Sequence, residues 1–188
     1  MKLRLRLRGV RCALATFGLG VLGYCGYVLA DAWQFQREAS VAFAEELAPV
    51  VVTPVRVAAE RIWGRVAVER LGLSVIVLEG TSAATLQRAA GHIAGTGMPG
   101  EPGNVGISGH RDTFFFPLRH VRTADVVTVT TRAGAFRYRV VSVTVVQPDD
   151  TGVLDADETQ VLTLVTCYPF TFIGSAPERF IVRAERVI

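Results

Sequence analysis

The chain has 188 residues, enough for one folded domain and a tail, and half of them are hydrophobic, as in ordinary globular proteins. Its formal charge of +3 comes from the first eleven residues, which hold five basic side chains and no acidic one. The remainder is slightly acidic, so composition and charge argue against a nucleic acid as partner.

The first predicted element is an apolar helix over residues 12–30, a run of 19 residues without a charged side chain. About 20 apolar residues are needed to cross the hydrocarbon core of a bilayer. Because the basic residues 1–11 precede this run, the positive-inside rule predicts a single-pass anchor in the cell membrane. Residues 1–11 would be a cytoplasmic tail and the rest of the chain extracytoplasmic. The alternative is a signal peptide cleaved after Ala30, although the run is longer than usual for one.

Residues 31–60 are predicted to be a stalk or linker between this anchor and the folded domain. In its first part, apolar side chains four residues apart indicate a helix with a packing stripe: Phe35, Ala39, Phe43 and Leu47. Prolines at positions 49 and 54 would end this helix. Nothing in the segment points to catalysis.

Residues 61–188 form the predicted folded domain, in which short β-rich runs replace the helical pattern. At least seven such runs can be recognised: residues 64–69, 73–78, 104–109, 126–131, 136–146, 161–166 and 180–187. A short helix is predicted over residues 81–90, with Thr81 or Ser82 as its N-cap, and a helical turn over residues 114–120. The pattern predicts a mostly-β fold, a closed or half-closed barrel with one or two short helices.

Cysteine usage singles out one thiol. Cys12 and Cys25 lie in the apolar run, which leaves Cys167 as the only cysteine of the predicted folded domain. An unpaired cysteine in an exported protein is a candidate reactive thiol. The simpler interpretation is a small buried hydrophobic residue.

Three short motifs lie at the ends of predicted strands. Residues 108–112 (SGHRD) end one strand, residues 163–167 (TLVTC) end another, and Arg179 begins the last one. A reactive cysteine needs a nearby cation or base that favours the thiolate. Neighbouring strand ends could bring Cys167, His110 and Arg179 together. Each also has a simpler interpretation, as a buried thiol, a structural histidine and a surface cation, and Arg111 could form a turn ion pair with its neighbour.

The motifs resemble those of a known family. TLVTC resembles the TLxTC motif of sortases, GHRD followed by phenylalanines resembles the family's histidine segment, and RFIVRA resembles its arginine strand. The three occur in the family's order over residues 62–188, and their details resemble class D sortases most, with class E as the near rival. The resemblance implies an eight-stranded β-barrel of the sortase type, preceded by a transmembrane helix.

The resemblance also implies a chemistry. It implies a cysteine transpeptidase, a hydrolase of the thiol-protease type, that cleaves an LPxTG-like C-terminal sorting signal between Thr and Gly. Cys167 would be the nucleophile that forms a thioacyl-enzyme, His110 the general acid and then base, and Arg179 the oxyanion donor. The amine of a cell-wall precursor or of another protein would then accept the cleaved protein at the cell surface.

Substrate contacts are expected next to the nucleophile. Thr166 would support the oxyanion hole or contact the signal peptide. Three apolar residues would line the groove for the peptide or belong to the core: Leu164, Val165 and Phe180.

No cofactor is expected. Some sortases bind Ca²⁺, and an acidic stretch could do so here: Asp149, Asp150, Asp155, Asp157 and Glu158. It lacks a regular ligand loop, so a solvated loop is the simpler interpretation. His92 and His120 do not have the spacing of a metal pair with His110.

Two other functions are compatible with these residues. One is an exported cysteine peptidase that hydrolyses the signal, since water access decides between hydrolysis and transfer. The other is a non-catalytic β-barrel binding module with a buried cysteine. An L,D-transpeptidase is disfavoured because its Ser-His-Gly-Cys context is absent.

Overall fold

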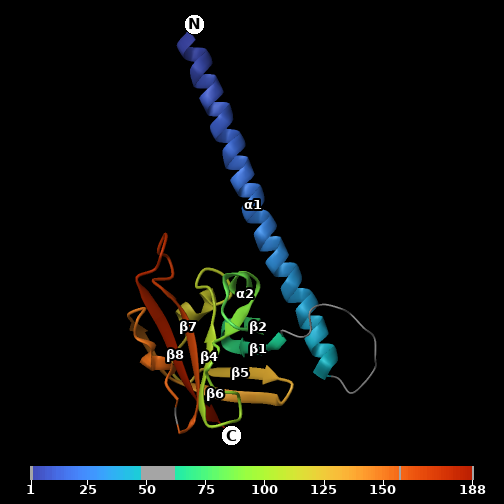
Figure 1. Ribbon diagram of the computed structural model, residues 1–188, viewed down its shortest axis with the longest axis vertical. Coiled ribbons are helices and arrows are strands. Elements are labelled where there is room, and N and C mark those ends of the chain that lie inside the picture. The colour runs from blue at the N-terminus through green and yellow to red at the C-terminus, as the bar shows by residue number, and fades with distance from the viewer. Residues whose placement is uncertain (1, 48–61, 157, 188) are drawn as a thin grey trace.

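The protein consists of a long N-terminal helix and a closed β-barrel beside the C-terminal half of that helix (Figure 1). The computed structural model describes residues 2–47, 62–156 and 158–187. The N-terminal half of the helix extends away from the barrel (Figure 1). The second part of the predicted stalk, residues 48–61, lies outside the described residues.

Eight strands close the barrel, as the family resemblance implies. They are β1 (Ile62–Val68), β2 (Leu73–Glu79), β3 (Ala90–His92), β4 (Gly103–Ser108), β5 (Val126–Thr131), β6 (Gly134–Val146), β7 (Gln160–Tyr168) and β8 (Glu178–Val187). Their order around the barrel is β1-β2-β3-β4-β7-β8-β6-β5. The β2–β3 and β4–β7 pairs are parallel and the others are antiparallel. The predicted mostly-β barrel is therefore confirmed.

Strand β3 was not predicted from the sequence. Its first residue, Ala90, is the last residue of the helix expected over residues 81–90, and three buried residues are too few for a period to show. Gly91 in its middle lies so close to the Gly80 carbonyl that a Cβ would collide with it. Tertiary packing therefore decides this strand, and the helix before it is shorter than predicted.

Four short helical segments connect the strands. They are η2 (Glu69–Leu71), α2 (Ala83–Arg88), η3 (Phe116–His120) and η4 (Thr151–Leu154). Ser82 is the N-cap of α2, because its hydroxyl accepts a hydrogen bond of 3.2 Å from the Thr85 N–H. Of the two predicted caps, Ser82 is thus the one used.

The barrel interior is filled by the inward-facing side chains of the strands. In β1 buried and half-buried residues alternate along all seven positions, as expected for a strand with one face on a core. Phe115 and Leu118, from the segment after β4, close one end of this core and are fully buried. The connection after β4 is therefore fixed by the packing of the core.

The helix α1 (Lys2–Leu47) runs without a break through the apolar run and the first part of the predicted stalk. From Leu14 to Glu45 it is long and apolar enough to cross a membrane, by length and composition. Near its C-terminal end two residues of the predicted packing stripe are buried, since Ala39 and Phe43 contact Ile62 and Ile76 of the barrel. Phe35 is half-buried, and the side chain of Leu47 lies outside the described part of the structure.

Polar contacts also hold the C-terminal half of α1 against the barrel. The Gln36 amide donates to the Arg88 carbonyl at 2.7 Å and accepts from the Ile76 N–H at 2.9 Å. Asp31 forms an ion pair of 2.8 Å with Arg88. Helix α1 thus belongs to the folded body from residue 31 onwards, beside β2 and α2.

Candidate active site

Cys167 and Arg179 lie opposite each other on two neighbouring strands. They are Cα partners in the antiparallel register of β7 and β8. Both residues are half-buried, and Cys167 is a free thiol. Adjacent pairing in a sheet places two Cβ atoms about 5 Å apart, which lets both side chains serve one reacting group.

His110 follows the end of β4, which is the parallel neighbour of β7. Ser108 pairs with Val165, and the Gly109 N–H donates to the Val165 carbonyl at 3.1 Å. His110 comes two residues after Ser108, and Cys167 comes two residues after Val165. Because parallel strands run in the same direction, both side chains come to the same end of the barrel.

Thr166 ties the histidine segment to the cysteine strand. Its side chain is buried, and its hydroxyl donates a hydrogen bond of 2.7 Å to the Gly109 carbonyl. A Cβ at Gly109 would lie 2.8 Å from the Phe115 ring, so the backbone packs directly on the core. Because Thr166 is buried, it offers no surface to a peptide. Of its two expected roles, this geometry agrees with support of the site, through the backbone next to His110.

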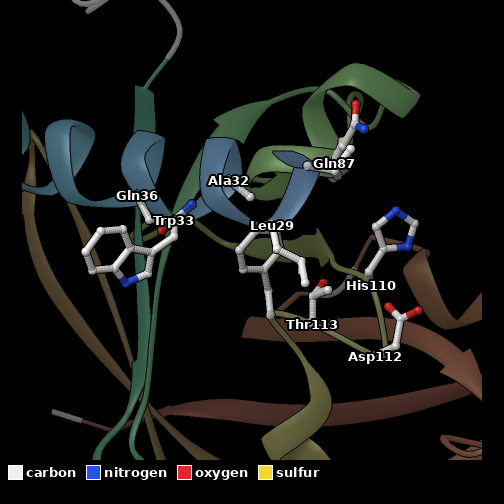
Figure 2. A pocket seen from close by; sticks show the side chains of 10 residues that line it. Leu29, Ala32, Trp33, Gln36, Gln87, His110, Asp112 and Thr113 are labelled. Carbon is white, nitrogen blue, oxygen red and sulfur yellow. The ribbon is translucent and has the colours of Figure 1, made fainter. Parts of the chain in front are cut away.

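Arg111 holds the loop between β7 and β8. Its Nη2 donates to the carbonyls of Phe172 and Gly174 at 2.7 and 3.0 Å. In place of the turn ion pair considered from the sequence, Arg111 forms two hydrogen bonds that join the segment after β4 to the loop after β7. Asp112 remains exposed beside His110 (Figure 2).

The Arg179 guanidinium uses only part of its donors. Its Nη1 donates to the carbonyls of Glu178 and Ala176 at 3.0 and 3.3 Å. Nε and Nη2 form no hydrogen bond with the residues that the structure describes. A guanidinium has five N–H donors in a rigid plane, so the group could still bind an oxyanion.

The three apolar residues expected at the groove have different surroundings. Leu164 is 1% exposed and belongs to the barrel core, whereas Val165 is half-buried. Phe180 packs edge-on against Phe170, with ring centroids 5.1 Å apart, and stacks with Tyr168 at 6.1 Å. Tyr168 and Phe170 come one and three residues after Cys167, and this aromatic cluster was not predicted.

Neither of the other two histidines faces the site. His92 is 4% exposed, stacks on Trp63 and has Glu79 and Thr96 as hydrogen-bond partners of its ring nitrogens. His120 accepts a hydrogen bond from Arg119 at the surface. Both have structural surroundings, in line with the spacing argument.

No group of three or more His, Cys, Asp or Glu side chains able to hold a metal occurs in the described parts of the chain. Of the acidic stretch considered for Ca²⁺, Asp157 lies outside the described residues. The described acids of that stretch are mostly exposed and belong to the connection around η4.

A cavity of about 540 Å³ opens beside His110, between α1 and the segment after β4 (Figure 2). The sequence had no motif for it, because its wall comes from a helix more than 70 residues earlier in the chain. It is lined by Val28, Leu29, Ala32, Trp33, Gln36, Gln87, His110, Asp112, Thr113 and Phe114.

A family model described as a sortase domain matches residues 66–187, a range that includes β4, β7 and β8 with all three motifs. The chain belongs to the sortase family. The resemblance carried by TLVTC, GHRD and RFIVRA is thereby confirmed, together with the sortase fold.

Among curated proteins, this sortase matches sortase D of Bacillus subtilis (strain 168), with 34% identity over 125 residues. The match covers 66% of this chain and 63% of the length of that relative. This similarity supports the assignment to class D.

Solved sortase structures have the same fold. A sortase D5 transpeptidase from Clostridium perfringens superposes with a TM-score of 0.68 at 23% identity, covering 85% of this chain and 99% of that one. Sortase C-1 from Actinomyces oris gives a TM-score of 0.63 at 27% identity, over 84% of this chain and 86% of that one. A lid mutant of sortase A from Corynebacterium diphtheriae gives 0.65 at 26% identity, over 86% and 92%.

Proposed function

We propose that this sortase is a membrane-anchored cysteine transpeptidase that cleaves an LPxTG-like sorting signal between Thr and Gly. It would transfer the cleaved protein to an amine at the cell surface, on a cell-wall precursor or on another protein. Cys167 is the nucleophile, His110 the general acid and base, and Arg179 the oxyanion donor.

One observation supports this proposal above the others: the register of three neighbouring strands. Cys167 and Arg179 are direct partners in β7 and β8, while β4 runs parallel to β7 and ends just before His110. A nucleophile, a proton carrier and a fixed cation thus come from distant parts of the sequence to one end of the barrel. Acyl transfer through a thioester needs this set of groups.

In the first half of the reaction the Cys167 thiolate attacks the carbonyl carbon of the substrate Thr. Negative charge develops on the carbonyl oxygen, and free N–H groups of Arg179 stabilise it. The C–N bond then breaks, and His110 gives its proton to the leaving glycine amine. The product is a thioester on Cys167 with a neutral His110.

In the second half an acceptor amine attacks the thioester carbon. The C–N bond forms, the C–S bond breaks, and its electron pair returns to the Cys167 sulfur. His110 takes one proton from the attacking nitrogen, which restores the starting state. If water attacks instead, the same site hydrolyses the signal.

We propose that α1 is a single-pass membrane anchor over residues 12–30, with residues 1–11 in the cytoplasm and the barrel outside. The large apolar side chains of this part of the helix are exposed: Leu14, Phe17, Leu19 and Leu22 are 65%, 73%, 70% and 69% accessible. Such surface is stable in lipid and unfavourable in water. The five basic residues before it support the proposed orientation.

The test is incubation of the full-length protein with LPxTG- and LAxTG-like peptides, with and without an added amine. The native protein should release the C-terminal fragment and form a conjugate with the amine. Cys167→Ala should abolish both products. Cys25→Ala, which removes an exposed cysteine of α1, is the matched control and should keep full activity. Equal product from the native protein and Cys167→Ala would falsify the assignment of the nucleophile.

A further inference from the structure

The cavity between α1 and the segment after β4 has no role in the cleavage of the signal as described above. We propose that it binds the acceptor amine, and that it selects primary amines that carry an apolar group. This inference rests on the proposed transpeptidase function, because it assigns the second substrate to a place next to His110.

The position of the cavity follows from the strand order. In the barrel, β4 lies between β3 and β7. On the β7 side of His110 are Cys167 and Arg179, whereas the cavity lies on the side of α1 and α2 and includes Gln87 of α2. His110 therefore stands between the acyl-carrying sulfur and the cavity. A base that takes a proton from an incoming amine needs this arrangement.

The polar side of the cavity is suited to an ammonium group. Asp112 and His110 lie next to each other along its edge (Figure 2). The Asp112 carboxylate is exposed and forms no ion pair within the described residues. An unpaired carboxylate attracts a cationic amine, and the Thr113 hydroxyl and Gln87 amide offer further hydrogen-bonding groups.

The opposite side of the cavity is apolar and comes from α1. Leu29 and Trp33 are 60% and 63% exposed. The Arg37 guanidinium lies 4.6 Å from the centroid of the Trp33 ring, and the remaining exposed surface can contact a ligand. Figure 2 shows Leu29, Ala32 and Trp33 along this wall, across from His110 and Asp112. Such a wall stabilises an apolar substituent on the amine by roughly 25 cal/mol for each Å² that it removes from water.

The wall also lies at the end of the proposed membrane span. Val28 and Leu29 belong both to the apolar run of residues 12–30 and to the lining of the cavity. An acceptor with an apolar portion could therefore reach the cavity along the membrane surface. This position favours an amphiphilic amine over a small hydrophilic one.

Each step keeps its protons in balance. An acceptor that arrives as an ammonium first releases one proton to bulk water. The neutral nitrogen then forms the C–N bond with the thioester carbon, His110 takes its second proton, and the Cys167 sulfur leaves with the electron pair of the C–S bond. Asp112 holds the cationic form before attack, so its removal should raise KM for the amine and leave kcat within about twofold.

The experiment measures kcat and KM for three amines with the full-length protein in detergent micelles and one LPxTG-like peptide. Methylamine is small and cationic near pH 7.5, benzylamine is cationic and apolar, and hydroxylamine is largely uncharged. The variants are Asp112→Asn, which removes the charge, and Leu29→Ala, which shortens the apolar wall. Glu101→Gln is the matched control, because Glu101 is an exposed acid in the loop before β4, at the other end of that strand.

We expect Asp112→Asn to raise KM about threefold for methylamine and benzylamine, with a change below about twofold for hydroxylamine. Leu29→Ala should lower kcat/KM about fivefold for benzylamine and much less for methylamine. Glu101→Gln should change none of these values.

Three results would overturn the inference. One is an equal effect of Asp112→Asn on all three amines, which would indicate a structural role. Another is an unchanged benzylamine preference in Leu29→Ala. The third is a higher KM for the peptide in Leu29→Ala with unchanged kcat and KM for the amines. That result would indicate that the cavity binds the sorting signal. If the native protein forms no product with any peptide, the proposed function fails and this inference fails with it.

Discussion

The two sides of His110 are built in different ways. On one side, Cys167 and Arg179 are held by the hydrogen-bonded pairing of β7 and β8, and both belong to recognisable motifs. On the other side, the cavity is formed by α1, α2 and the segment after β4, and no motif marks it. We propose that the strand side carries the chemistry of the family and that the helix side selects the second substrate.

The two sides also differ in what stabilises them. Closing a barrel pairs every strand on both edges, so the strand side cannot move without disrupting the sheet. The helix side depends on a small contact, in which Ala39 and Phe43 pack on Ile62 and Ile76 and Gln36 forms two hydrogen bonds. Substitutions can therefore disturb one side and leave the other intact.

The largest effect is expected from Arg179→Lys on the strand side. A lysine keeps the charge but loses the planar set of N–H donors, so the oxyanion is less well stabilised. We expect turnover to fall about a hundredfold or more, with an unchanged circular dichroism spectrum. Arg139→Lys, at an exposed position of β6, is the control and should be silent. Near-native turnover of Arg179→Lys would remove this residue from the oxyanion role.

A smaller effect is expected from Thr166→Val, which acts on the strand side through His110. Valine has the same shape but cannot donate to the Gly109 carbonyl, which loses its side-chain partner. We expect kcat to fall about tenfold while KM for the peptide stays within about twofold, and Thr166→Ser to restore most of the activity. A raised KM with unchanged kcat would instead indicate that Thr166 contacts the peptide.

On the helix side, Ala39→Glu should separate α1 from the barrel. Position 39 is fully buried between the helix and the barrel, and an unpaired carboxylate is costly there. Peptide cleavage should stay within about twofold of the native rate, while the preference for benzylamine over methylamine falls about fivefold. Val41→Glu, at an exposed position of the same helix, is the matched control. A retained preference in Ala39→Glu would mean that the helix does not contribute to amine binding.

The smallest effect is expected at Asp125, which belongs to neither side of His110. Hydrogen bonds from the Arg70 side chain, at 2.5 and 2.6 Å, lower the pKa of Asp125, which lies before β5. The bond from the Arg122 N–H, at 2.8 Å, acts in the same direction.

A lowered pKa in the folded state stabilises the protein above the unfolded pKa of about 3.9. This contribution disappears as the pH falls through the lower, folded pKa. We expect Asp125→Asn to lower Tm by roughly 5 °C at pH 7, and the difference from the native protein to shrink below pH 4. Asp149→Asn, at an exposed position, should leave Tm unchanged. A difference that grows on acidification would contradict this assignment.

Much of the barrel could be predicted because its strands have clear local patterns. The long alternating or β-branched runs of β1, β2, β5, β6, β7 and β8 were recognised within a few residues of their observed bounds. Strand β3 was missed because three residues are too few to show a period. Position 91 needs a glycine because a Cβ there would collide with the Gly80 carbonyl, which the local sequence does not reveal. Helix α2 was predicted too long, over residues 81–90, because Ser82 is its N-cap and Ala90 already belongs to β3.

The candidate site could be predicted only in part. Cys167, His110 and Arg179 could be proposed because family motifs surround them, although the sequence did not show how their strands would be arranged. A local ion pair was one interpretation of Arg111, but its hydrogen-bond partners lie more than 60 residues later, on Phe172 and Gly174. Local sequence cannot reveal a partner that only the fold brings near.

The sequence by itself determined the apolar N-terminal run, the β-rich pattern and the identity of the one thiol in the folded domain, because each is a local property of composition or period. The tertiary structure alone decided that β4 lies between β3 and β7, so that His110 has the strand of Cys167 on one side and a cavity on the other. It also decided that α1 forms the wall of that cavity. These are contacts between distant segments, which depend on how the barrel closes and on which surface remains for the helix to cover.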